Sequence, residues 1–151
     1  MWEHEESIDI ASPPAKVYRY LADFARHSEW SMSVATIEQV TPGPVSVGTE
    51  FKSTETIPQK FVSVARVTAL QAPSRVSWES TDYRIFRTKW SLAMSERNGG
   101  THLTQRVRFE PIGFLGNLLL LMRKRQVPPE NRQSLERIKA KLEGSEHPGG
   151  Q

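Results

Sequence analysis

The pattern of apolar and polar positions changes several times along the chain. A short alternating segment, residues 6–10, is followed by a helical spacing in which Val17, Leu21 and Phe24 recur at i, i+4 and i+7. Alternation with a period of two then covers residues 34–111, and a helical spacing returns near the end. The pattern therefore predicts one strand, two short helices, a run of strands and a final helix.

The first helix has a recognisable start. Ser12 can cap a helix N-terminus through its side-chain oxygen, and Pro13 can occupy the first turn, where its missing N–H costs nothing. We predict that this helix has Ser12 as its N-cap and ends near Asp23. A second short helix is expected over residues 24–30.

Turn residues divide the alternating part into six strands. TPGPVSVG (41–48), QAPS (71–74) and RNGG (97–100) are rich in the residue types that turns use. The strands predicted between them cover residues 34–40, 49–56, 60–70, 75–80, 83–94 and 101–111. With the first strand, this gives seven consecutive antiparallel strands.

The strand predicted over residues 83–94 decides the architecture. At about 3.3 Å per residue it would span about 40 Å, roughly twice the usual length, so the sheet must curve around something. The final segment supplies that object, because Leu135, Ile138 and Leu142 recur at helical spacing among charged residues. We predict an α+β fold in which a curved seven-stranded sheet wraps around a long C-terminal helix.

The inner face of the sheet can be assigned on three strands. Its residues are Val76, Trp78, Phe86, Thr88, Trp90, Leu92, Met94, Leu103, Gln105, Val107 and Phe109. Two of them, Thr88 and Gln105, are polar, and a buried amide without a partner costs about 1–3 kcal/mol. Gln105 must therefore meet a protein group, water or a ligand. The aromatic residues fit either simple core packing or a small-molecule cavity.

Composition and charge narrow the classes of function. The chain has 151 residues, no cysteine and a net charge of +3, with its basic residues spread out. Disulfide and thiolate chemistry are excluded, and no pattern indicates nucleic-acid binding. The start MWEHEESIDI lacks the regions of a signal peptide, so we expect a cytoplasmic location.

Candidate catalytic and metal-binding groups are sparse. The four histidines lack the spacing of metal ligands, and no phosphate-binding loop is present, so we predict no metal and no cofactor. His27 could face a cavity mouth, but a surface position is the simpler interpretation. No Asp, Glu or His lies on the inner faces assigned above. This favours a binding protein over an enzyme, and a wrongly assigned face would reverse the conclusion.

The run IDIASPPAKVYRYLADFARHSEW, followed by VTPGPVSVGTEF and an amphipathic C-terminal helix, resembles the START-like helix-grip superfamily (SRPBCC). Within it, the chain is similar to the polyketide cyclase/dehydrase and lipid transport family. The matching positions are Ile10, Pro13, Val17, Tyr18, Leu21, Asp23, Trp30, Val47, Gly48 and Thr49. The resemblance covers residues 7–143. It implies a deep apolar cavity between sheet and helix, in members that bind lipids, sterols, polyketides or hormones and of which some are enzymes.

The resemblance also implies a ligand-binding site. It places near the cavity wall Trp30, Phe51, Trp78, Phe86, Thr88, Trp90, Gln105, Val107 and Phe109. The final helix of the family is uninterrupted, whereas here Pro128 and Pro129 are expected to break it, at about 3 kcal/mol for each proline inside a helix. We expect one domain over residues 1–143 and a disordered tail over residues 144–151.

The uncharged segment 111–122 contains four consecutive leucines. It is too short to span a hydrocarbon layer of about 30 Å, which needs about 20 helical residues. We interpret it as a lid over the cavity entrance, loosened by Gly113 and Gly116 and mobile relative to the final helix, with contact to a partner chain as the alternative. Its ligand-binding side chains are predicted to be Phe114, Leu118, Leu121 and Met122. The basic residues 123–125 could hold this lid at an anionic membrane surface, at about 1 kcal/mol each.

Two functions follow from the sequence. The first is non-catalytic binding or transport of a hydrophobic small molecule, such as a lipid, a fatty acid or a polyketide-like compound, between the sheet and the C-terminal helix. The alternative is a polyketide aromatase/cyclase or dehydratase that uses the same cavity. We expect no nucleic-acid partner and a transient contact with a membrane surface, and either a monomer or a homodimer fits the sequence.

Overall fold

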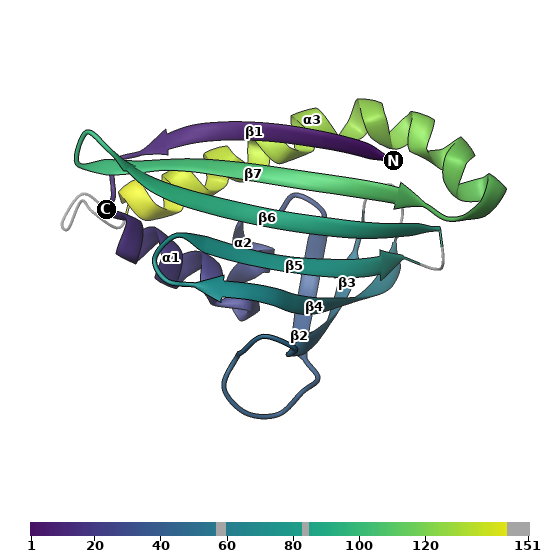
Figure 1. The fold of residues 1–151 in the computed structure, drawn as a ribbon, viewed down its shortest axis with the longest axis horizontal. Coiled ribbons are helices and arrows are strands. Elements are labelled where there is room, and N and C mark those ends of the chain that lie inside the picture. The colour runs from purple at the N-terminus through teal and green to yellow at the C-terminus, as the bar shows by residue number, and fades with distance from the viewer. Residues whose placement is uncertain (57–59, 83–84, 145–151) are drawn as a thin grey trace.

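The computed structural model describes residues 1–56, 60–82 and 85–144, and its strands form one antiparallel sheet (Figure 1). The strands are β1 (Trp2–Ile10), β2 (Val34–Gln39), β3 (Glu50–Glu55), β4 (Phe61–Gln71), β5 (Arg75–Asp82), β6 (Phe86–Arg97) and β7 (Gly100–Pro111). Their order in the sheet is β1-β7-β6-β5-β4-β3-β2. The helices are α1 (Pro14–Ala22), the 3-10 turn η1 (Phe24–Arg26), α2 (His27–Trp30) and α3 (Gly113–Gly144). The predicted helix-grip fold is confirmed.

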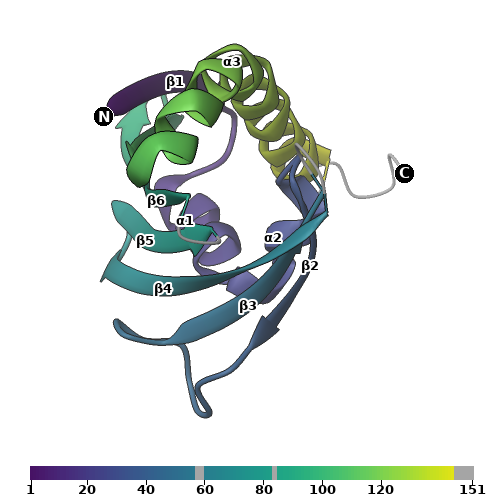
Figure 2. The same ribbon diagram turned by 90° about the vertical axis from the view of Figure 1, so that its right-hand side faces the viewer.

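The sheet curves around α3. The longest strands are β6 and β7, each of 12 residues, and a sheet with strands of this length bends rather than staying flat. Figure 2 shows α3 lying inside this curve, with β1 on one side and β2 on the other. The helix packs against β1 and β7 and against α2. The concave face of the sheet and α3 therefore enclose the interior.

The inner faces assigned from the sequence are confirmed on β5, β6 and β7. Val76, Leu92, Leu103 and Val107 are fully buried, and the residues between them are more exposed. The predicted hairpin over residues 97–100 is also present, because Asn98 and Gly99 both adopt the positive φ angles that such a turn requires. Alternation was sufficient for these strands because one of their faces packs on the core and the other meets solvent.

The core has two parts. The larger is built on the C-terminal half of α3, where Leu135, Ile138 and Leu142 pack against α1 and the sheet, as the helical spacing predicted. The smaller lies under the N-terminal half of α3 and consists of Phe86, Val107, Phe109, Leu120 and Val127. The two halves of the helix are thus anchored separately.

β1 is longer than the sequence pattern predicted and begins at Trp2. The added residues include Glu3 and Glu5, which obscure the apolar alternation. They lie opposite Arg108 and Arg106 on β7, and Arg106 donates to Glu5 at 2.6 Å. This edge strand is therefore aligned partly by cross-strand charge pairs, which a search for apolar alternation does not detect.

The N-terminus of α1 differs from the sequence prediction. The N-cap is Pro13, in an extended conformation and without a side-chain cap bond, so the assignment of Ser12 was wrong. The two prolines at positions 13 and 14 lack N–H groups, which leaves fewer donors for a capping side chain to satisfy. Ser12 instead belongs to the connection after β1, where its carbonyl accepts a bond of 2.7 Å from Thr101.

The predicted break at Pro128 and Pro129 is also wrong, because α3 continues through both residues to Gly144. The carbonyl groups that lose their helical partners belong to Lys124 and Arg125, which are exposed, so water can take the place of the missing N–H. An ion pair also spans the prolines. Arg123, one turn before them, donates to Glu130, immediately after them, at 3.1 Å.

The start of α3 is fixed to the sheet. Gly113 has a positive φ of 68°, and the backbone N–H of Ile112 donates to the carbonyl of Ile85 at 2.7 Å. A side chain at Gly116 would collide with that same carbonyl, so this position requires glycine for close packing. Gly116 therefore holds the segment on the sheet, in contrast to the loosening that we expected from the sequence.

Residues 145–151 of the predicted tail lie outside the described residues. Residues 83–84, where a strand was predicted to start, lie outside them as well.

Candidate ligand-binding site

A cavity lies between the concave face of the sheet and α3. Its walls come from η1 and α2, the segment that leads into β2, the inner faces of β3 to β7, and residues 130–134 of α3. The volume of the cavity is about 50 Å³, and it lies in a recess of about 660 Å³ that is partly open solvent. Small-molecule sites typically occupy about 300–1,000 Å³. A ligand of that size would therefore require neighbouring side chains to move aside, or would project into the open part of the recess.

Aromatic rings form one wall of the cavity. Trp78 on β5 and Trp90 on β6 are register partners, and their rings stack at 6.1 Å with an interplanar angle of 11°. Phe24 meets Trp78 edge to face at 5.5 Å. These rings are held in place by the sheet and by one another, so they offer a rigid apolar surface against which a flat ligand can pack.

Three buried polar atoms at the cavity have no hydrogen-bond partner among the described residues. They are Nε1 of Trp30, Oε1 of Gln105 and Nδ2 of Asn131, and all three residues line the cavity. Leaving such an atom unpaired costs about 1–3 kcal/mol, and most buried polar groups are paired. The residues that carry these two donors and one acceptor all line the same cavity, which suits a ligand that carries both kinds of group.

Glu55 brings a carboxyl group to the cavity from the end of β3. It accepts hydrogen bonds from Ser63 at 2.6 Å, from Ser53 at 3.4 Å and from Ser33 at 3.5 Å. Burial raises the pKa of the Glu55 carboxyl, and these serines together with the charge of Arg123 offset part of the rise. Glu55 can therefore exchange a proton at a higher pH than an ordinary glutamate.

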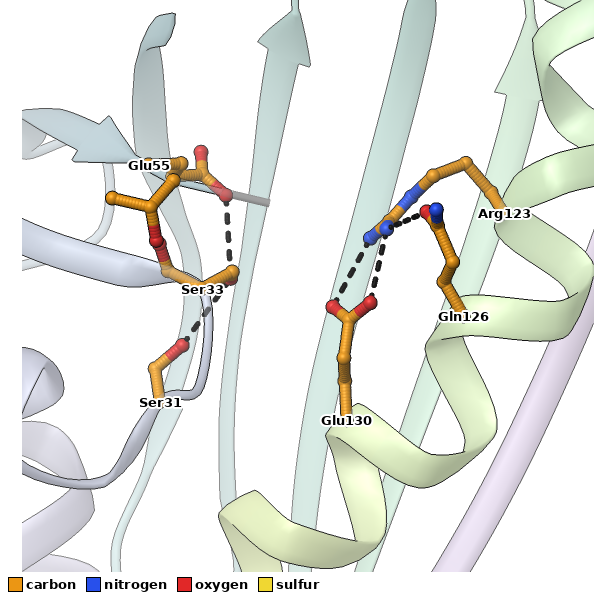
Figure 3. A network of polar contacts seen from close by, with 7 residues as sticks. Ser31, Ser33, Glu55, Arg123, Gln126 and Glu130 are labelled. Atoms are coloured by element: carbon orange, nitrogen blue, oxygen red, sulfur yellow. Dashed lines mark hydrogen bonds and ion pairs between the residues drawn. The ribbon is translucent and has the colours of Figure 1, made fainter. Parts of the chain in front are cut away.

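Two groups of polar residues lie on opposite sides of the cavity (Figure 3). On one side, Ser31 and Ser33 lead to Glu55 on β3. On the other side, Arg123 reaches down from α3 to Glu130, and its guanidinium also donates to Gln126 at 2.7 Å. The cavity thus has a carboxyl group on one side and an ion pair on the other.

His27 lies inside the protein, so the interpretation of a surface position was wrong. It is 3% exposed and lines the cavity, where its ring stacks on Phe24 at 4.4 Å and contacts Trp78 at 5.0 Å. Its Nε2 donates to the carbonyl of Leu21 at 2.9 Å. Burial lowers the pKa of His27 to about 4, so the ring is neutral at pH 7 and its Nδ1 is an acceptor.

The structure brings together some of the predicted ligand-binding residues at this cavity and places others elsewhere. Those that line it are Trp30, Trp78, Trp90 and Gln105. Phe51 stacks on Phe24 in the larger part of the core, and Thr88 is buried on β6 without a partner for its hydroxyl. The residues that belong to the smaller part of the core are Phe86, Val107 and Phe109.

The predicted lid residues do not line the cavity. Phe114, Leu118, Leu121 and Met122 are exposed on the outer side of α3, and Leu120 and Gly116 are the buried members of this segment. Only one side of the helix can meet the sheet, and the sequence pattern could not tell which side because apolar residues occur all around it.

Sequence reasoning missed Glu55, and it favoured the surface for His27 although it had named this residue as one that could face a cavity mouth. Glu55 could have been found, because Phe51, Ser53 and Glu55 alternate on β3 and must share the face that was assigned to Phe51. That observation removes the argument that no acid reaches the inner face. His27 offers no such signal, because the break between η1 and α2 changes the helical phase, so the spacing of α1 does not extend to it.

The described residues include neither a metal-binding cluster nor a helix that could span a membrane. Within the described ranges, no group of three or more His, Asp or Glu side chains is arranged to hold a metal ion. None of the helices in that part of the chain combines the length and the apolarity needed to cross a membrane.

The fold and the cavity together define a helix-grip domain with an internal cavity. The family model for polyketide cyclase/dehydrase and lipid transport matches residues 1–143, and the chain belongs to this family. Its name covers proteins that act on polyketides and on lipids, which are hydrophobic small molecules. A comparison with curated proteins found no match.

Solved structures support the same fold. The Zhui aromatase/cyclase from Streptomyces sp. R1128 is similar with a TM-score of 0.82 and 12% identity, over 99% of this chain and 98% of that one. TTHA0849 from Thermus thermophilus is similar with a TM-score of 0.75 and 16% identity, over 97% of this chain and 100% of that one. Ara h 8.0201 is similar with a TM-score of 0.72 and 16% identity, over 95% of this chain and 98% of that one. At these low sequence identities, the similarity shows a shared fold and nothing more.

Proposed function

We propose that this chain binds a small hydrophobic molecule that carries an aromatic ring system and oxygen-containing groups, as polyketide-like compounds do. The observation that carries the proposal is that Trp30, Gln105 and Asn131, each with an unpartnered buried polar atom, line one cavity walled by stacked tryptophans. A carbonyl or hydroxyl oxygen can accept from Trp30 and Asn131, and a hydroxyl can donate to Gln105. The family assignment favours the same class of ligand.

The lining argues against a simple fatty acid. Ser53, Ser63 and Ser80 line the recess together with Glu55 and Glu130. These groups largely pair with one another or with Arg123, but a saturated chain would leave the unpaired atoms of Trp30, Gln105 and Asn131 without partners, which is unfavourable. A planar molecule with polar substituents on its edge can pack on Trp78 and Trp90 and still satisfy the polar side. Among a lipid, a fatty acid and a polyketide-like compound, the lining favours the last.

Replacing Gln105 with leucine tests this proposal. The variant loses the acceptor that a ligand hydroxyl would use, so we expect affinity for a hydroxylated anthraquinone to fall about tenfold. Without ligand, the variant should be at least as stable as the original protein, because an unpaired buried amide has been removed. Fluorescence of the cavity tryptophans gives the affinity, and thermal unfolding gives the stability.

The matched control is Gln133→Leu, which makes the same change at an exposed position on α3 and should leave affinity unchanged. A saturated fatty acid of similar size serves as the comparison ligand. Tighter binding of the fatty acid than of the anthraquinone, with no loss in the Gln105 variant, would contradict the proposal.

Catalysis is the second candidate, as a polyketide aromatase/cyclase or dehydratase. The observation in its favour is Glu55, a half-buried carboxyl at the cavity whose pKa is raised by burial. Ring closure requires a base that removes a proton from a carbon next to a carbonyl group, and dehydration requires an acid that protonates the departing hydroxyl oxygen. A carboxyl that holds its proton closer to neutral pH can serve in either role.

Glu55→Gln separates a carrier from an enzyme. If the protein is an enzyme, we expect the variant to keep its ligand affinity within a few fold and to lose about 10²–10⁴-fold in turnover of a poly-β-ketone substrate. Product formation is followed by mass spectrometry. If the unaltered protein binds this substrate and returns it chemically unchanged, the function is binding alone.

A further inference from the structure

The N-terminal half of α3 carries an exposed apolar strip. Phe114 is 84% exposed, and the exposures of the other members are 51% to 62%. The strip consists of Phe114, Leu115, Leu118, Leu121 and Met122. These residues recur at i, i+1, i+4, i+7 and i+8, a spacing that places them on one side of a helix. Gly116, Leu120 and Arg123 are buried on the other side.

The strip differs from the other exposed apolar positions. Val40, Val47, Val62 and Val64 are also exposed, but the first two flank the loop after β2, and the other two form only a pair on the outer face of β4. Isolated exposed apolar residues are ordinary on protein surfaces, whereas a contiguous patch marks an interaction site. The strip places five large apolar side chains within nine residues of one helix.

The charged residues within the segment that carries the strip are all positive. No acidic residue occurs from position 111 to position 129. Arg125 follows Leu121 by one helical turn and so lies on the side of the strip, and Lys124 lies at its flank; both are exposed. Arg123 points the other way and is held by Glu130. The outer surface therefore combines an apolar centre with two available cations at one end.

This combination fits an anionic membrane surface. An amphipathic helix that lies in the membrane interface buries its apolar side chains at the boundary of headgroups and acyl chains, while its basic residues reach the lipid phosphates. A second copy of the chain is less suitable, because its strip would bring the same cations and no acidic residue to pair with them. We infer that the strip docks the domain on the surface of an anionic membrane, with α3 lying along that surface.

The inference concerns a surface and does not depend on the identity of the cavity ligand. The strip and the buried Arg123 occupy opposite sides of the same helical segment, and Arg123 pairs with Glu130, which lines the cavity (Figure 3). A docked domain would thus hold at the membrane the helix that forms one wall of its cavity.

Co-sedimentation with vesicles tests the inference. We expect the protein to bind vesicles of phosphatidylcholine with 30% phosphatidylglycerol at low salt, and to bind pure phosphatidylcholine at least tenfold more weakly. A Lys124→Gln, Arg125→Gln variant should lose about 30-fold in affinity for the anionic vesicles, at about fivefold for each basic residue. Raising the salt concentration should weaken binding of the unaltered protein toward that of this variant.

A Leu118→Asp, Leu121→Asp variant should lose vesicle binding altogether, because it places charges in the centre of the strip. Val62→Asp, Val64→Asp is the matched control on the outer face of β4 and should bind as the original does. Thermal unfolding and ligand affinity, measured for each variant, show that folding and the cavity are intact. Failure to bind anionic vesicles, equal loss in the control, or a dimer in light scattering that only the strip variant disrupts would each overturn the inference.

Discussion

Replacing Arg123 with methionine is expected to destabilise the domain by about 3–5 kcal/mol. The side chains of Arg123 and Glu130 are only 11% and 15% exposed, so the variant would leave a carboxylate largely buried without its partner. Breaking one side of a buried ion pair has a cost of about this size. The variant would also remove the guanidinium from the ring of Phe109, whose centre lies 5.7 Å away.

The loss of stability in this variant is expected to be largest around Pro128 and Pro129. Pro128 and Pro129 lie between Arg123 and Glu130, and the helix continues through them although two backbone hydrogen bonds are missing. The ion pair joins the turn before the prolines to the turn after them. We expect hydrogen exchange of the backbone amides around residues 123–131 to accelerate in the variant more than exchange in the C-terminal half of α3.

Denaturation with urea at pH 7 measures this loss. Lys124→Met, at the adjacent exposed position, is the control and should change the free energy of unfolding by less than about 0.5 kcal/mol. In the double variant Arg123→Met, Glu130→Leu, no charge is left unpaired, so part of the loss should be recovered. A single variant as stable as the original protein would show that the pair does not stabilise the helix.

The second large effect concerns acid stability and His27. Because burial lowers the pKa of this side chain from its ordinary value of 6.5 to about 4, the unfolded chain binds a proton at pH values where the folded chain does not. Folding stability from this group is therefore fully present above pH 6.5 and decreases as the pH falls toward 4. The decrease amounts to about 3 kcal/mol at pH 4.

His27→Gln tests the origin of this decrease. Glutamine can donate to the carbonyl of Leu21 as the imidazole does, but it has no proton to gain in this range. The free energy of unfolding, measured between pH 7 and pH 4, should fall by about 3 kcal/mol less in the variant than in the original protein. If the free energy of unfolding depended on pH in the same way in both proteins, His27 would be accessible to solvent and its pKa would not be lowered.

The sequence was informative where one face of an element meets the core and the other meets water. The strands from β5 to β7 and the anchor formed by Leu135, Ile138 and Leu142 follow their apolar periodicity closely. The long β6 also implied the curvature of the sheet, and with it the position of α3. The fold could be derived because these signals are local and agree with one another.

The candidate site was less predictable because it depends on how elements meet. Trp78, Trp90 and Gln105 were found from alternation, but Asn131 is recognised only after α3 has been placed against the sheet. The proline pair was misread because propensity describes an isolated helix, and here the tertiary structure supplies the ion pair between Arg123 and Glu130. The leucine run was assigned to the cavity although its apolar side chains face both ways.

The central claim is that the unpartnered atoms at the cavity are satisfied by the polar groups of an aromatic ligand. A crystal structure of the protein with a hydroxylated anthraquinone tests it most directly. We expect density for the ring system against Trp78 and Trp90, with ligand oxygens at about 3 Å from Nε1 of Trp30, Nδ2 of Asn131 and Oε1 of Gln105. Ligand at saturating concentration that leaves these three atoms unpaired, or an empty cavity, would contradict the account.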